Sequence, residues 1–288
     1  MRFDPLIFCR SAALAIGVTA FCQAALAVAP TAIESVSLSA AHPQVRLPIA
    51  LKNGQLYLLK ATGVLRNGKN VLDAEYLNGA DFIGKADVGV DVGLPAPRNA
   101  PGRMKWFGGY RKDHSYAMIV TGAGRPLDLR LIGAGGKGSI TVAVMPLSGK
   151  ALGKPLESLK VSVMEVKEYS KLVTKPSTVY LLECAGQGRV GGGGLGMGDA
   201  DYMDYRADGA GHEDIGDRNT DYGLGIDEAN QDITPRKRWW GPFRLDHDYF
   251  MLFEGTGKPI QFFYYDVKGG YGDNSPTDRL KVNIFKLP

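Results

Sequence analysis

Two stretches of this sequence match each other without a gap: KWFGGYRKDHSYAMIVTGAGRP at 105–126 and RWWGPFRLDHDYFMLFEGTGKP at 238–259. Each begins with aromatic residues, passes through an Asp-His pair into an apolar run, and ends in Gly-x-Gly-x-Pro. Internal similarity over a window of this length indicates that the chain contains two copies of one structural unit.

Other segments extend the repeat in both directions. Upstream of the window, three segments of the first copy match segments of the second: LYLLKATG at 56–63 with VYLLECAG at 179–186, DAEYL at 73–77 with DADYM at 199–203, and Asp-x-Gly at 87–89 with Asp-x-Gly at 221–223. Downstream, LKVSV at 159–163 matches LKVNI at 280–284. On this pattern the first copy spans 40–168 and the second 179–288. The polar, proline-containing stretch 169–178 between them has the composition of a linker.

The apolar segments within each copy are short, rich in Val, Ile, Tyr and Phe, and bounded by Gly, Pro or Asp. Such segments are typical of strands, and the absence of any long run with helical period favours an all-β chain. We therefore predict two tandem β-sandwich domains, one for each copy.

The N-terminus has the pattern of an export signal. Arg2 and Arg10 precede an uncharged run from Ser11 that ends in Ala-Leu-Ala at 25–27, which predicts a cleavable signal peptide over 1–27. We expect a secreted or periplasmic protein with no stable membrane insertion after cleavage.

Of the three cysteines only Cys184 remains after removal of the signal peptide, so no intramolecular disulfide is expected. The net charge of +4 gives no indication of nucleic-acid binding.

The Asp-His pair of the repeat is a candidate for acid–base chemistry. It occurs in both copies, and a feature that both copies share serves the fold more readily than a single active site. A turn or a buried hydrogen-bonded pair is the favoured interpretation, and a hydrolase using Asp246 and His247 lacks a nucleophile motif. We predict that the protein is not an enzyme. The acidic segment 199–232 is interpreted mainly as a solvated face.

Only the second copy has a loop that concentrates hard oxygen donors and glycines between its last two strands. Its members are Asp266, Gly269, Gly270, Tyr271, Gly272, Asp273, Asn274 and Ser275. Calcium prefers oxygen ligands from carboxylates, amides and backbone carbonyls, although the same residues also form turns with no metal present. The first copy places Met145 or Gly133, according to the alignment, opposite Asp266. It lacks that carboxylate either way.

Residues 264–284, YYDVKGGYGDNSPTDRLKVNI, contain a Tyr-x-Asp-Val opening, a Gly-x-Tyr-Gly core and an Asn-Ser pair before the final strand. This stretch resembles the end of the LecA-type bacterial lectins, a calcium-dependent galactophilic family. The resemblance implies a galactose-binding-like β-sandwich in which two sugar hydroxyls complete the coordination of calcium. The implied metal ligands are Asp266, Gly270, Asp273, Asn274 and Tyr205.

The resemblance also implies residues that contact the sugar. They are Asp266, Asp273, Tyr222, Asn219 and Tyr271. Three of these positions differ from the family: Asp273 replaces an Asn, while Asn219 and Tyr222 stand where the family has His and Gln. The leading hypothesis is an exported calcium-dependent carbohydrate-binding protein that acts through its second copy on galactose-type sugars. The alternative is a structural or partner-binding envelope protein whose loop binds calcium for stability only, or not at all.

Overall fold

The computed structural model describes residues 30–78, 88–93, 107, 110–133, 135–147, 152–191, 196–204, 223–226, 240–241, 243–266 and 270–287. The predicted signal peptide over 1–27 lies outside this range. The described chain is all-β, built from antiparallel strands with one short 3-10 helix in the second half. We call residues 30–147 the first half and residues 152–287 the second half.

The predicted segments form strands because they are short and rich in β-branched and aromatic residues, which favour the extended backbone. In β6 (Ser115–Thr121) and β16 (Asp248–Glu254) every second side chain is buried, as expected when one face of a strand packs on a core. The segments predicted as strands are confirmed: LYLLKA lies in β3 (Leu56–Asn67), YAMIV in β6, ITVAV in β8 (Lys137–Leu147), VYLLEC in β11 (Val179–Ala185), YFMLF in β16, IQFFYY in β17 (Pro259–Tyr265) and LKVNIF in β18 (Arg279–Lys286).

The first half contains two sheets over one core. Its strands are β1 (Glu34–Leu38), β2 (Gln44–Arg46), β3 (Leu56–Asn67), β4 (Asn70–Leu72), β5 (Gly89–Asp91), β6, β7 (Asp128–Ile132) and β8 (Lys137–Leu147). One sheet has the order β1-β8-β3-β4 with β6 also paired to β3, and the other has the order β2-β7-β5. Inward-facing residues of both sheets, among them Leu59, Val90 and Leu129, form a single hydrophobic cluster.

The second half repeats this arrangement around its own cluster of buried residues. Its elements are β9 (Glu157–Ser162), β10 (Glu168–Val173), β11 (Val179–Ala185), β12 (Gly188–Arg189), β13 (Met197–Gly198), β14 (Met203–Asp204), β15 (Gly223–Ile226), β16, β17 (Pro259–Tyr265), the 3-10 helix η2 (Gly270–Asp273) and β18 (Arg279–Lys286). The two main sheets run β16-β11-β18-β9 and β10-β17-β15, and β12-β13-β14 form a small third sheet.

The strand order follows the sequence repeat. β3 lies between β6 and β8 just as β11 lies between β16 and β18, and β7 between β2 and β5 just as β17 lies between β10 and β15. The register agrees as well. Gly89 pairs with Ile132, and its counterpart Gly223 pairs with Tyr265.

The pairing corrects the predicted boundary between the copies. LKVSV at 159–163 was assigned to the first copy as the counterpart of LKVNI, but β9 pairs with β18 itself and Val161 lies in the second core. The two strands resemble each other because both alternate apolar and polar residues on the same core. The assignment of 169–178 to a linker is also wrong, since β10 pairs with β17 and Thr174 is buried.

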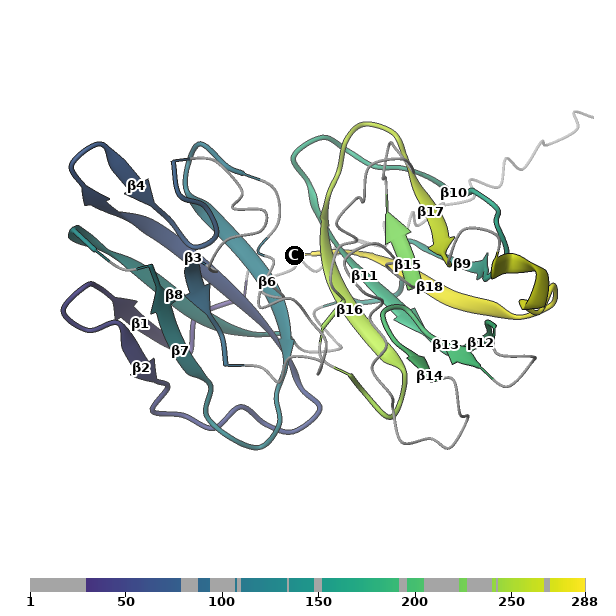
Figure 1. Ribbon diagram of the computed structural model, residues 1–288, viewed down its shortest axis with the longest axis horizontal. Helices are drawn as coiled ribbons and strands as arrows, with labels where there is room; N and C mark the ends of the chain where they lie inside the picture. The colour runs from purple at the N-terminus through teal and green to yellow at the C-terminus, as the bar shows by residue number, and fades with distance from the viewer. Residues whose placement is uncertain are drawn as a thin grey trace, which may run out of the picture.

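The two halves adjoin through equivalent strands (Figure 1). β6 and β16 each lie at an edge of their sheet, paired on one side only. The guanidinium of Arg111, just before β6, forms an ion pair with the carboxylate of Glu254, the last residue of β16. The two edge strands therefore run in opposite directions past each other.

Candidate functional site

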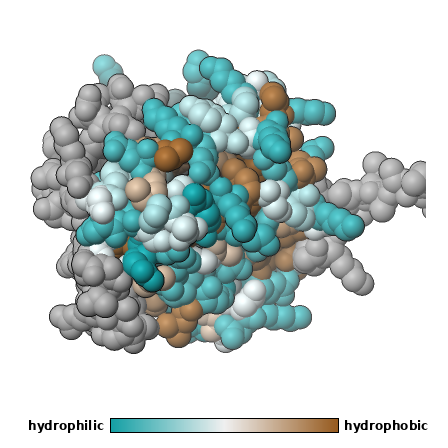
Figure 2. Space-filling view, turned by 90° about the vertical axis from the view of Figure 1, so that its right-hand side faces the viewer, coloured by the Kyte–Doolittle hydropathy of each residue, from teal (hydrophilic) through white to brown (hydrophobic). Residues whose placement is uncertain are grey.

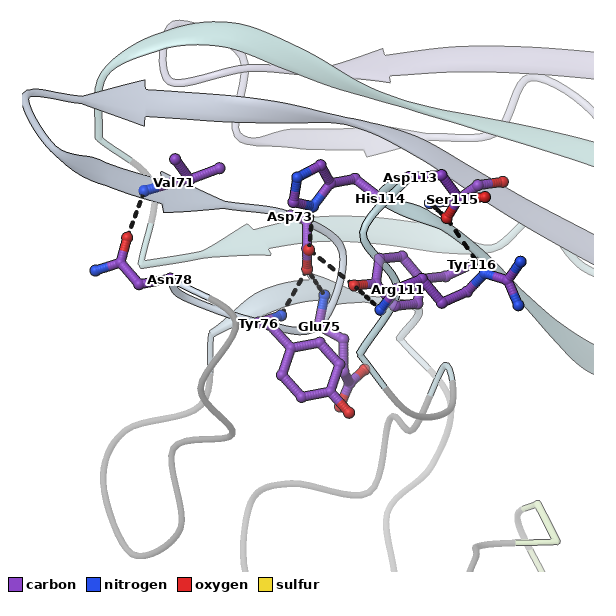
Figure 3. A network of polar contacts seen from close by, with 10 residues as sticks. All are labelled: Val71, Asp73, Glu75, Tyr76, Asn78, Arg111, Asp113, His114, Ser115 and Tyr116. Carbon is purple, nitrogen blue, oxygen red and sulfur yellow. Dashed lines mark hydrogen bonds and ion pairs between the residues drawn. The ribbon is translucent and has the colours of Figure 1, made fainter.

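The Asp-His pair of the repeat belongs to a polar network around a buried aspartate (Figure 3). In the first half, Asp73 is 1% exposed and its Oδ2 lies 2.7 Å from His114 Nδ1 and 2.8 Å from the Tyr116 hydroxyl. Its Oδ1 accepts hydrogen bonds from the backbone N–H groups of Glu75 and Tyr76, at 3.0 and 2.7 Å. One carboxylate thus holds a turn and the start of β6 together.

The second half builds the same network around Asp199, which is also 1% exposed. Its Oδ2 lies 2.8 Å from both His247 Nδ1 and the Tyr249 hydroxyl, and its Oδ1 accepts from the N–H groups of Asp201 and Tyr202 at 2.9 and 2.7 Å. Burial and the charge of Asp199 raise the pKa of Tyr249 far above its usual range, so its hydroxyl remains a donor.

Both histidines end a turn in the left-handed backbone region, with φ of 50° at His114 and 49° at His247. The preceding aspartates, Asp113 and Asp246, bind the arginine that opens each turn. Of the two interpretations of the pair, the turn is confirmed in both halves. The pair itself is not buried, because Asp113 and Asp246 are exposed and the buried partner of each histidine is a separate aspartate. The interpretation of segment 199–232 as a solvated face is wrong at its start, because Asp199 and Asp201 are buried acceptors.

The two halves differ where β7 and β17, the middle strands of the two three-stranded sheets, end. Ile132 and Tyr265 occupy the same register position, so Gly133 corresponds to Asp266. In the first half residues 133–136 lead directly into β8, with Gly133 and Gly136 at positive φ. In the second half residues 266–278 separate β17 from β18. This stretch, which we call the candidate loop, has no counterpart of its length in the first half.

Tyr271 anchors the first part of the candidate loop to β17. Its hydroxyl donates to the carbonyl of Tyr264 at 2.9 Å and accepts from the backbone N–H of Asp266 at 3.2 Å. Burial raises the pKa of Tyr271 to about 12, which keeps the hydroxyl protonated at neutral pH. The turn of η2 is therefore fastened to the end of the strand that carries Asp266.

Asn274 anchors the second part. It is 6% exposed, its Nδ2 donates to the carbonyl of Val163 at 2.7 Å, and its Oδ1 accepts from the N–H of Gly191 at 3.2 Å. Further along, the N–H of Ser275 donates to the carbonyl of Arg189 at 2.9 Å. The backbone N–H of Arg189 in turn donates to Asp278, and this bond lowers the pKa of that carboxyl. The candidate loop thus packs against β12 and the end of β9.

The predicted site residues fall into three groups. Asp266 is half-buried at the end of β17, Gly270 opens η2, and Asp273 is exposed on the side of Gly191. Asn274 and Tyr271 are the two anchors. The remaining predicted residues, Tyr205, Asn219 and Tyr222, lie outside the described residues. Within the described ranges, no three His, Cys, Asp or Glu side chains gather as a group that could hold a metal.

Several residues that shape this region were not predicted from the sequence. Val163, Arg189 and Gly191 hold the candidate loop from distant segments, and no local pattern marks them. The aromatic residues on the outer face of β17 could have been found, because IQFFYY places aromatic side chains at successive positions and so on both faces of the strand.

The fold and this loop define an all-β protein with sandwich-like sheets that bears a long polar loop on its second half. Comparison of the chain with protein-family models, with curated proteins and with solved structures found no match. None of the helical segments in the described residues has the length and apolar character needed to cross a membrane.

Proposed function

We propose that the chain is an exported calcium-dependent carbohydrate-binding protein of lectin type, made of two tandem β-sandwich domains and acting through the candidate loop of the second. The observation that supports this most is the contrast between the halves. They share strand order, core and the buried aspartate network, yet only the second has the candidate loop. A feature absent from one copy is not needed to form the fold.

The chemistry of the candidate loop fits calcium. Asp266 and Asp273 supply carboxylates and Gly270 a backbone carbonyl, the hard oxygen donors that calcium prefers. Asn274 Oδ1 already accepts one hydrogen bond from Gly191 and retains a second lone pair for a cation. The carbonyl of Tyr205 would be a further ligand. A bound calcium would supply vacant coordination positions for two neighbouring sugar hydroxyls.

The protein's own residues would orient the sugar. Asp266 would accept a hydrogen bond from a sugar hydroxyl, and the ring of Tyr271 or Tyr222 would pack against the apolar face of the sugar. Asp273 and Asn219 would be further polar contacts. Because the rigid anchors of the candidate loop hold its backbone before binding, little conformational entropy would be lost on complex formation.

A second candidate function has its own support. Both ends of the Asn274 amide and the hydroxyl of Tyr271 are engaged within the protein. A loop fastened in this way is also what a structural or partner-binding envelope protein would need. In that case calcium would only stabilise the loop, or would not bind.

Calorimetric titration of galactosides and a small glycan panel into the mature protein, with calcium and with a chelator, tests the proposal. Asp273→Ala removes an exposed carboxylate of the candidate loop, and Asp128→Ala removes an exposed carboxylate of the first half as the matched control. We expect a heat of sugar binding only when calcium is present. This heat should be absent in Asp273→Ala and unchanged in Asp128→Ala.

Two other results would be informative. Absence of heat from every sugar, together with a rise in melting temperature on adding calcium, would select the structural alternative. Export has a separate test: expression with the native N-terminus followed by mass measurement should give a chain that begins at Val28.

A further inference from the structure

The outer face of β17 carries a row of side chains that do not belong to the core. Ile260, Phe262 and Tyr264 point into the second hydrophobic cluster, so the alternating residues Gln261, Phe263 and Tyr265 point outward. Phe263 is only 5% exposed although it lies outside that cluster. It is therefore covered by neighbours on the outer face of the sheet.

Two of those neighbours are aromatic. The rings of Phe263 and Tyr265 have centroids 5.0 Å apart at 74°, and those of Phe263 and Tyr271 have centroids 6.3 Å apart at 67°, both edge-to-face. Tyr271 is the anchor of the candidate loop, so this cluster is continuous with the candidate site. Edge-to-face packing fixes the orientation of each ring.

The row continues across the sheet onto the edge strand β10. Tyr169 pairs with Gln261, its hydroxyl donates to Gln261 Oε1 at 3.1 Å, and the residue is 57% exposed. We call Tyr169, Phe263, Tyr265 and Tyr271 the aromatic face. Tyr265 lies four positions after Gln261 on β17, about 13 Å away at the rise of an antiparallel strand. The aromatic face is therefore longer than a single sugar ring.

Figure 2 shows the side of the molecule on which η2 lies, where hydrophobic side chains reach the surface in small groups among hydrophilic ones. Tyr169 and Val173 on β10 and Val166 before it are exposed in this half. A surface that alternates ring faces and hydrogen-bonding groups matches a carbohydrate chain, whose units present C–H faces and hydroxyl edges in turn.

The first half provides an internal comparison. The positions equivalent to Tyr169, Gln261, Phe263 and Tyr265 are Arg46, Asp128, Arg130 and Ile132, as the registers of β2 with β7 and of β10 with β17 indicate. Arg46 and Asp128 form an ion pair at 3.8 Å. The same face of the same sheet is thus stable without aromatic residues, and their presence beside the candidate loop is not a requirement of the fold.

We infer that the aromatic face binds a carbohydrate chain of several sugar units, one of which is held at the candidate loop while the others lie across β17 towards Tyr169. This inference rests on the proposed function for the unit at the loop. Phe263 packs edge-to-face against Tyr265 and Tyr271 and so fixes the two tyrosine rings at the loop end of the aromatic face. The exposed ring of Tyr169 packs on the sugar unit farthest from the loop. The hydrogen bond to Gln261 holds that ring in place before binding.

A ladder of galacto-oligosaccharides from the monosaccharide to the pentasaccharide, titrated in the presence of calcium, tests this inference. We expect affinity to rise with chain length, and Tyr169→Ala to lower pentasaccharide affinity about tenfold while leaving the monosaccharide unchanged. Tyr169→Phe keeps the ring and should keep most of the gain. Arg46→Ala, at the same strand position in the first half, should behave as the parent protein.

The outcomes separate this inference from the proposed function. Monosaccharide binding that does not strengthen with chain length overturns the aromatic face and leaves the candidate loop in place. Chain binding that is lost in Tyr169→Ala but persists in Asp273→Ala and in chelator upholds the aromatic face and removes the calcium site. No binding of any length overturns both. An effect of Tyr169→Ala that is confined to self-association in sedimentation overturns the aromatic face alone.

Discussion

Replacing the buried aspartate of either network should destabilise the half that contains it, and by a similar amount in both. In Asp199→Asn the side-chain oxygen can still accept the two backbone N–H groups. The new NH₂ group, however, replaces Oδ2, the acceptor that lies 2.8 Å from both His247 Nδ1 and the Tyr249 hydroxyl. Two hydrogen bonds to a charged group are lost where solvent cannot compensate. At about 1.5–3 kcal/mol each, the expected cost is about 3–6 kcal/mol.

Asp73→Asn is the matched variant, because the four contacts of Asp73 agree with those of Asp199 to within 0.1 Å. Urea unfolding followed by circular dichroism and by tryptophan fluorescence measures both, with Trp240 reporting from the second core. Asp128→Asn, at an exposed position, should change stability by less than about 0.5 kcal/mol. Losses below about 1 kcal/mol in both buried variants would refute the reasoning, since they would mean that the carboxylates are not the centres of these networks.

Two further predictions concern the second half. Asn274→Ala leaves the N–H of Gly191 and the carbonyl of Val163 without their hydrogen-bond partner. We therefore expect the free energy of unfolding in urea to fall by about 2–4 kcal/mol and proteolysis within 266–278 to become faster. Unchanged proteolysis would show that other contacts hold the loop. Burial, reinforced by Glu183, raises the pKa of Asp248 to about 6 from 3.8. The folded state then binds more protons than the unfolded state between about pH 4 and 6, so this group lowers stability as pH rises through that window. Asp248→Asn should therefore raise the melting temperature at pH 7 and leave it nearly unchanged at pH 3.5, and equal shifts at both pH values would contradict the assignment.

Much of the fold could be predicted because strand composition and the internal repeat can be read directly from the sequence. The segments YAMIV and YFMLF are short and apolar and each lies between an Asp-His pair and a Gly-x-Gly, and each became an edge strand in which every second side chain is buried. The match of Asp-x-Gly at 87–89 with 221–223 gave the right correspondence of β5 with β15. The sequence left both Met145 and Gly133 opposite Asp266, and only the strand register selects Gly133.

Other parts depend on contacts that no local pattern encodes. LKVSV and LKVNI look equivalent because both are half-buried strands, and only the pairing shows that they are neighbours. Asp199 and Asp201 are typical of a solvated acidic run, yet both accept hydrogen bonds from backbone groups brought there by the chain after residue 200. The anchoring of Asn274 depends on Val163 and Gly191, far away in sequence.

The meeting of β6 with β16 gives the first half a use of its own. Equivalent edges that cross in opposite directions are related by an approximate two-fold axis, so the chain resembles a homodimer whose subunits have been fused. An unpaired strand edge is a template for aggregation, and here each half covers the edge of the other. Because the partners are tethered, this mutual protection does not weaken on dilution. The first half, which has no long loop after β7, can therefore be retained because it covers the edge of β16. Its other surface residues can be substituted as long as β6 keeps its conformation.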